Sequence, residues 1–99
     1  MIRHVVLTKL RNVEDAVKIF AALKTLKNQI AGIIAVSAGK DVSPEGLQRG
    51  FTHGFTVDFA DAAARDAYLP HPAHQEVGAM IVGGAEGGIE GITVVDWEM

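Results

Sequence analysis

Residues 68–74 bring together the side chains of this chain that are best suited to acid–base chemistry. The stretch reads Tyr-Leu-Pro-His-Pro-Ala-His and holds two of the four histidines, two of the three prolines and the only tyrosine. An imidazole takes up or releases a proton near neutral pH, and a phenol can donate a hydrogen bond to a carbonyl oxygen on which charge develops. We therefore take His74 as a candidate general base and Tyr68 as the candidate group that holds a substrate carbonyl.

Each of these side chains also has a plain structural interpretation. His74 can be a buried neutral histidine satisfied by a main-chain carbonyl, and Tyr68 can close a helix end with its hydroxyl in water. Pro70 ends the preceding helix, because the residue before a proline is pushed out of the helical region. His71 is followed by Pro72, which suits the N-cap of a helix whose first residue is proline, so we assign His71 to the backbone.

Two further histidines lie in segments with the alternation of β-strands. His4 and His53 each share one side of such a segment with apolar residues, and these sides are expected to meet the helices. Both are therefore predicted to bind substrate in the same pocket as His74. A lone strand histidine is more often a satisfied core residue, so the functional interpretation depends on their meeting in space. The apolar wall of the pocket is predicted from three phenylalanines, Phe20, Phe55 and Phe59.

The composition excludes several classes of function. Without cysteine, the chain has no disulfide, thiolate nucleophile or cysteine-based zinc site. A net charge of −3, a pI near 5.7 and the lack of any Lys/Arg run argue against nucleic acid and anionic membranes as partners. The N-terminal apolar segment is too short for a signal peptide, and no apolar run approaches the roughly 20 residues that span a bilayer. We expect a cytoplasmic protein.

We predict neither a metal nor an organic cofactor. Metal sites need three or four ligands in fixed geometry, usually with a carboxylate or cysteine among them, and Pro72 restricts the geometry between His71 and His74. The glycines of residues 83–91 have neither a leading strand at the required spacing nor a following Gly-Lys-Ser/Thr, so they do not form a nucleotide loop. We interpret this segment as a flexible connection.

The elements that must position these residues follow the order β-α-β-β-α-β in one predicted domain, residues 1–99. Asn12 and Asp61 are the predicted N-caps of the two helical regions, and Pro70 breaks the second region in two. This order is the α+β ferredoxin-like sandwich, with the helices on one face of a four-stranded antiparallel sheet. The predicted ranges are strand 2–10, helix 13–30, strands 33–42 and 51–59, helix 62–69, helix 72–84 and strand 92–98.

The uncovered sheet face is also predicted to be apolar. Val5, Leu7, Val95 and Trp97 should lie on it. An apolar face of this size does not stay in water, so we predict a homodimer with two sheets packed face to face.

Several segments together resemble the stress-responsive A/B barrel (Dabb) family across nearly the whole chain. The resemblance implies a homodimeric α/β barrel of two ferredoxin-like subunits. At residues 83–91 the chain departs from the family, whose members usually continue there with larger apolar residues. The matching segments are IRHVVL (2–7), GKDVSPEGL (39–47), GFTH (50–53), AYLPHPAH (67–74) and VVDW (94–97).

The resemblance also implies roles for particular residues. A plant member, olivetolic acid cyclase, closes a linear polyketide by aldol condensation with a histidine and a tyrosine in the same Tyr-x-x-His-Pro-x-His motif. Carried over, the base falls on His74 and the supporting phenol on Tyr68. Pocket histidines of the cyclase fall on His4 and His53.

Two classes of function stay open at this point. The first is a cofactor-free acid/base enzyme that acts on a small, partly apolar carbonyl compound. Polyketide-cyclase-like aldol chemistry, lactone isomerisation and cofactor-free oxygenation all need such a base, and the fold does not choose between them. The second is a ligand-binding or stress-protective dimer without catalysis, which fits the small size and the lack of a cofactor motif.

Overall fold

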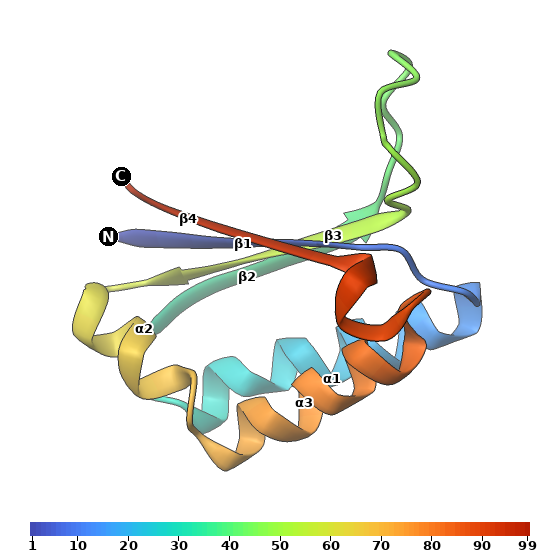
Figure 1. Cartoon of the computed structure of the whole chain (residues 1–99). Coiled ribbons are helices and arrows are strands. Elements are labelled where there is room, and N and C mark those ends of the chain that lie inside the picture. The colour runs from blue at the N-terminus through green and yellow to red at the C-terminus, as the bar shows by residue number, and fades with distance from the viewer.

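A four-stranded antiparallel sheet with helices on one face forms the structure, a computed structural model that describes residues 1–99 (Figure 1). The strand order is β2-β3-β1-β4. The predicted ferredoxin-like order is confirmed, including the break in the second helical region. The elements are β1 (Ile2–Thr8), α1 (Val13–Gln29), β2 (Ile33–Lys40), β3 (His53–Phe59), α2 (Ala62–Tyr68), α3 (Pro72–Gly84), the 3-10 turn η1 (Gly88–Gly91) and β4 (Ile92–Glu98).

Strand alternation decides which side chains face the helices. We call the side that α1 and α3 cover the inner face. In α3, Val77 and Ile81 are buried against the core, whereas Met80 is 38% exposed. Met80 lies one position off the buried stripe of this helix. The buried inner-face residues of β1 and β3 are Ile2, His4, Val6, Thr8, His53, Phe55, Val57 and Phe59.

The two predicted N-caps differ in outcome. Asp61 accepts a hydrogen bond from Ala64 N at 2.8 Å, which confirms it as the cap of α2. Asn12 occupies the cap position of α1, but its side chain makes no capping hydrogen bond, so this detail of the prediction is wrong. The first turn of α1 instead carries Glu14 and Asp15, whose charges suit the positive end of the helix dipole.

The glycine-rich segment 83–91 is held in place by the main chain. Arg11 N donates to Gly84 O at 3.0 Å, Glu86 N to Lys9 O at 2.7 Å, and Lys9 N to Gly91 O at 2.9 Å. A Cβ at Gly91 would lie 2.2 Å from Glu86 O, so glycine is required there for close backbone approach. The prediction of a flexible connection is therefore wrong, because these contacts with the end of β1 are not visible in local composition.

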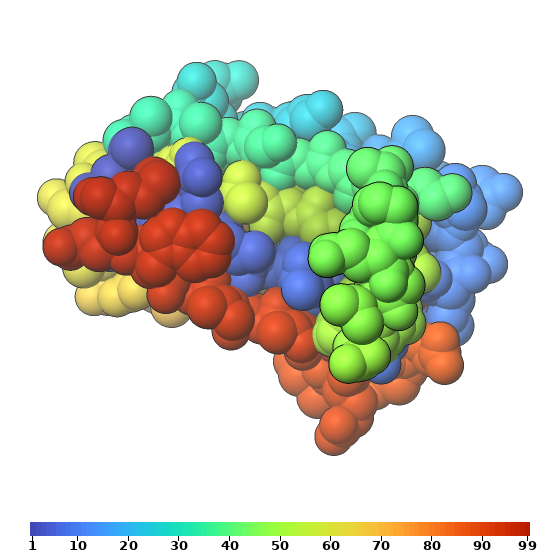
Figure 2. Space-filling view, turned by 90° about the horizontal axis from the view of Figure 1, so that it is seen from above, coloured from blue at the N-terminus to red at the C-terminus, as the bar shows by residue number.

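The outer face of the sheet is open. Leu7 on β1 and Val95 and Trp97 on β4 are exposed there, as predicted. We call residues 41–52, which connect β2 to β3 and rise from this face, the arm (Figure 1). Figure 2 shows the outer face as a floor of β1 and β3 between the arm and the C-terminal end of β4. None of the helices combines the length and the apolar character needed to cross a bilayer.

Candidate acid–base site

The joint between α2 and α3 fixes Tyr68 and His74 on its two sides. Tyr68 is the last residue of α2, and Pro72 is the first of α3. His71 Nδ1 accepts a hydrogen bond from Ala73 N at 3.1 Å and so caps α3. The assignment of His71 to the backbone is confirmed, and the rings of Tyr68 and His74 are left to face each other.

His74 is oriented so that one ring nitrogen is free. Its Nδ1 lies 3.0 Å from the main-chain oxygen of Leu69, and its ring centroid lies 4.1 Å from that of Tyr68. A carbonyl oxygen only accepts, so Nδ1 carries the hydrogen and the neutral ring presents Nε2 as a lone pair. The ring is half-buried, which lets it exchange protons with solvent. This geometry gives His74 the tautomer that a general base needs.

Tyr68 is buried at the centre of an aromatic cluster. Its side chain is 1% exposed, and its ring lies 4.9 Å from Phe59 and 6.0 Å from His4, between centroids. Its hydroxyl makes no hydrogen bond within the chain. Burial raises the pKa of the Tyr68 phenol, so the group stays protonated and can act as a hydrogen-bond donor.

Burial lowers the pKa of His74, the candidate base. The pKa of His74 lies below its usual 6.5, chiefly because desolvation disfavours the imidazolium. The hydrogen bond to Leu69 opposes this shift, and the charges of His4 and His71 add to it. His74 is therefore neutral, and able to take up a proton, at pH 7.

A third group at this end is a histidine held by a carboxylate. His4 Nδ1 donates to Asp96 Oδ1 at 2.7 Å, and Asp96 Oδ2 accepts from Arg65 Nη1 at 3.0 Å. Arg65 also pairs with Asp66 at 2.9 Å. The carboxylate fixes the His4 ring with Nε2 directed away from Asp96, as a carboxylate bonded to one ring nitrogen does for other functional histidines.

Sequence reasoning missed Asp96 and Arg65. Asp96 lies opposite His4 in the β1–β4 ladder, and the two are 92 positions apart in the chain. One signal was present: Asp96 falls on the same side of its strand as Ile92 and Val94, and a carboxylate facing a core needs a partner. Which partner it finds depends on strand register.

The predicted site residues divide into two groups. One end of the inner face, which we call the His4 end, brings together His4, Tyr68, His74 and Phe59. At the other end His53 packs with Phe20, with 5.8 Å between ring centroids, and bonds to Thr52 Oγ1 through Nδ1 at 2.8 Å. The expectation that His53 meets His4 and His74 is wrong, because His53 pairs with Thr8, four residues along β1 from His4. Phe55 pairs with Val6 between the two ends.

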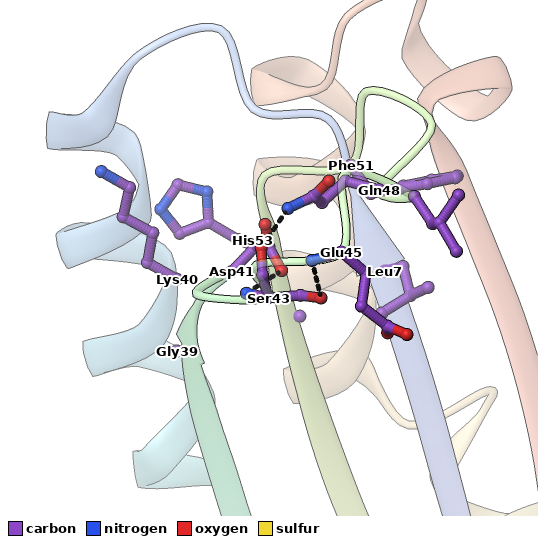
Figure 3. A pocket seen from close by; sticks show the side chains of 11 residues that line it. Leu7, Gly39, Lys40, Asp41, Ser43, Glu45, Gln48, Phe51 and His53 are labelled. Atoms are coloured by element: carbon purple, nitrogen blue, oxygen red, sulfur yellow. Dashed lines mark hydrogen bonds between the residues drawn. The ribbon is translucent and has the colours of Figure 1, made fainter.

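Among the hollows on the surface, two are well defined; neither is lined by His4, Tyr68 or His74, and His53 lines the first. One of about 420 Å³ lies on the outer face under the arm, where Leu7, Asp41, Gln48 and Phe51 are among its lining residues (Figure 3). The other, of about 240 Å³, lies between α1 and α3. No three His, Asp or Glu side chains are grouped so that they could hold a metal ion.

Comparison with known proteins agrees with this fold. The chain matches the description "Stress responsive A/B Barrel Domain" over residues 2–99. It is 31% identical to the stress-response A/B barrel domain-containing protein HS1 of Arabidopsis thaliana, over 98% of this chain and 88% of that protein.

Solved structures give the same result. A dimeric ferredoxin-like protein of unknown function from Jannaschia sp. CCS1 is 31% identical with a TM-score of 0.91, over 99% of this chain and 98% of that one. A hydroxynitrile lyase from Passiflora edulis shares the fold, with a TM-score of 0.86 at 21% identity over 99% of this chain and 92% of that one. The chain belongs to the stress-responsive A/B barrel domain (Dabb) family.

Proposed function

We propose that this protein is a cofactor-free acid/base enzyme that acts on a small carbonyl compound. The observation that carries the proposal is the hydrogen bond from His74 Nδ1 to the oxygen of Leu69, which leaves Nε2 unprotonated beside the phenol of Tyr68. His74 removes a proton from the carbon next to the carbonyl group, and Tyr68 donates a hydrogen bond to the oxygen that becomes an enolate.

The remaining groups of this end complete the reaction. His4, held by Asp96, offers its Nε2 to orient the substrate or the base. Phe59 supplies an apolar wall. In an aldol cyclisation, the enolate carbon forms a bond to a second carbonyl carbon of the same molecule. The proton taken up by His74 then neutralises the alkoxide, so the base is regenerated without a cofactor.

The proposal is tested by proton exchange, which requires no knowledge of the final product. Wild-type protein in D₂O should catalyse hydrogen–deuterium exchange at the α-carbon of β-diketones and linear polyketide analogues, followed by NMR. His74→Gln should lower the exchange rate by about 10²–10⁴-fold, and Tyr68→Phe by about 10²-fold. The matched control is His71→Asn, which removes a histidine from the same motif but retains a capping side chain.

A second candidate is a ligand-binding or stress-protective dimer without catalysis. The tight packing favours it, since Tyr68 is 1% exposed and neither hollow reaches His74. If wild type exchanges no α-proton above the rate of the His74→Gln variant across diketones, polyketide analogues and lactones, the catalytic proposal is wrong and this candidate takes its place. Lactone isomerisation and cofactor-free oxygenation use the same base, and product analysis separates them from cyclisation.

We also infer that two copies pack through their outer faces. Val95 and Trp97 are 52% and 48% exposed on this face, and the ferredoxin-like relative from Jannaschia sp. CCS1 is dimeric. Apolar area of this kind is stabilised by a second apolar sheet. Sedimentation at micromolar concentration should give a dimer that Val95→Glu dissociates. Val17→Glu, at an exposed valine on α1, is the matched control. A wild-type monomer would overturn the inference.

A further inference from the structure

The larger of the two hollows, of about 420 Å³, lies between the arm and the strands beneath it (Figure 3). Its lining includes Gly39 of β2 and Gly54 of β3, which are partners in the β2–β3 ladder. A Cβ at Gly39 would meet no atom within 4 Å, so the space above this glycine is open. The apolar side chains of the lining are Leu7, Leu47 and Phe51. The hollow therefore has the room and the apolar contacts to receive a large side chain.

The arm holds the shape of this hollow through its own hydrogen bonds. Gln48 Nε2 donates to Ser43 O at 2.7 Å, and Phe51 N donates to Gln48 O at 3.0 Å. At the base of the arm, Asp41 N donates to Thr52 O at 2.8 Å, which keeps its two sides together. A hollow that is already formed loses less conformational entropy when it is filled.

Trp97 is a large apolar side chain at the opposite end of the same face. It is the only tryptophan of the chain and is 48% exposed. Trp97 pairs with Arg3 of β1, whereas Leu7, at the hollow, lies four residues further along this strand, which is roughly 13 Å. Figure 2 shows the arm and the C-terminal end of β4 at opposite ends of the floor. The outer face thus has an exposed ring at one end and a hollow at the other.

A two-fold axis can bring these two features together. If two copies pack face to face about an axis that runs across the strands near Val5, each end of one sheet lies over the opposite end of its partner. The exposed ring of each copy then meets the hollow of the other, and the same contact forms twice. An axis parallel to the strands would instead bring arm against arm and leave both rings outside the hollows.

The lining also suits the polar atom of an indole ring. A buried tryptophan N–H needs a hydrogen-bond acceptor, and it can only donate. The carboxylates of Asp41 and Glu45 and the amide oxygen of Gln48 belong to the lining of the hollow. Apolar contacts and acceptors are therefore both available where the ring would lie.

We propose that the hollow under each arm binds the partner's Trp97, so that each arm clasps the far end of the other copy's sheet. The hollow is complete only in the dimer, and the contact fixes the direction in which the two sheets face each other. This contact rests on the inferred packing of two outer faces and is independent of the acid–base chemistry at His74.

Cross-linking tests the contact, because the chain has no cysteine of its own. Ser43→Cys places a thiol in the hollow, and Met99→Cys places one two residues beyond Trp97 while leaving the ring intact. After the two variants are refolded together, a short bismaleimide should give covalent dimers, and neither variant alone should give any. Product from either variant alone would mean that like ends meet and would overturn the proposal.

Sedimentation of the same samples separates this contact from the dimer itself. A mixture that sediments as a dimer but gives no cross-linked product would overturn the contact and leave the outer-face dimer in place. A monomeric wild type would overturn both.

Filling the hollow from within one copy is an independent test. Gly39→Leu adds a side chain in open space on a strand, so its thermal unfolding should start from a normally folded chain. The added side chain should exclude the partner's Trp97 and raise the dissociation constant of the dimer about tenfold, measured by sedimentation. Gly78→Leu on α3, where a Cβ also meets no atom within 4 Å, is the matched control and should leave the dimer unchanged. An unchanged dissociation constant for Gly39→Leu would overturn the proposal.

Discussion

The two ends of the inner sheet face hold their polar groups in different ways. At the His4 end, the imidazole is fixed by Asp96, the carboxylate by Arg65, and the second imidazole by the oxygen of Leu69. At the other end, which we call the Thr8 end, the buried hydroxyl of Thr8 has no partner and His53 is held by Thr52 alone.

The two ends differ in whether the chain itself supplies hydrogen-bond partners for their polar groups. Catalytic groups must be held in one geometry before the substrate arrives. At the His4 end hydrogen bonds within the chain hold the two imidazoles in this way, whereas Tyr68 is held by packing alone. At the Thr8 end the chain leaves the hydrogen-bonding capacity of one buried hydroxyl unused. The predictions below test this contrast, beginning with the largest expected effect.

Replacing Tyr68 separates its packing from its hydroxyl. Tyr68→Ala should lower the free energy of unfolding by about 3–5 kcal/mol, because it opens a cavity between Phe59 and His4. Tyr68→Phe should cost less than about 1 kcal/mol, since the hydroxyl has no hydrogen bond to lose. Urea denaturation measures both. A large cost for Tyr68→Phe would show that the phenol has a structural partner and would weaken its assignment to substrate.

Local sequence patterns predicted much of the structure at the His4 end. Pro70 and Pro72 mark the joint because proline restricts the residue before it and is favoured at the first helical position. His71 follows from the same logic, as a capping side chain just ahead of Pro72. The relation between Tyr68 and His74 was also within reach, because both lie within one short segment.

Contacts between residues that lie far apart in the sequence could not be predicted from local patterns. Asp96 meets His4 only because β4 pairs with β1 in one particular register, and a shift of one residue would turn Asp96 to the outer face. The separation of His53 from His4 has the same origin. Whether the Thr8 hydroxyl finds a partner depends on every neighbour around it, and no sequence pattern records that.

The Thr8 end is nevertheless rigid in its backbone, and Gly91 tests this. Gly91→Ala should lower the free energy of unfolding by about 1–3 kcal/mol, because the added Cβ would collide with the oxygen of Glu86. The control is Gly83→Ala in α3, where a Cβ meets no atom within 4 Å; it should stabilise the protein by about 0.5–1 kcal/mol. Thermal unfolding of both variants gives the comparison. Equal behaviour would mean that the segment is loose after all.

Asp96→Asn tests the orientation at the His4 end. The amide oxygen can still accept from His4 Nδ1, but the charge-assisted part of the hydrogen bond is lost, so stability should fall by about 1 kcal/mol. The α-proton exchange rate should fall as well, because His4 is no longer held by an anion. An exchange rate equal to that of wild type would show that the charge on Asp96 does not orient His4.

The smallest effect is a pH dependence that both ends share. The folded state lowers the pKa of His74 and His53 below the usual 6.5, chiefly through desolvation. Above pH 6.5 both rings are neutral in the folded and in the unfolded protein. Protonation then favours neither state, and the free energy of unfolding keeps its full value. As the pH falls below 6.5, the unfolded chain takes up protons that the folded chain resists, and the free energy of unfolding decreases.

Urea denaturation between pH 5 and 8 measures the slope of the free energy of unfolding against pH. Asp58 does not titrate in this range, because Arg3 lowers the pKa of that carboxyl below 3.8. The slope should correspond to no more than about one proton for each histidine, and less for the half-exposed His74. His74→Gln should remove its part, and His53→Phe the rest. A double variant with the wild-type slope, or stability that rises as the pH falls from 6.5 to 5, would show that neither ring is held neutral by the fold.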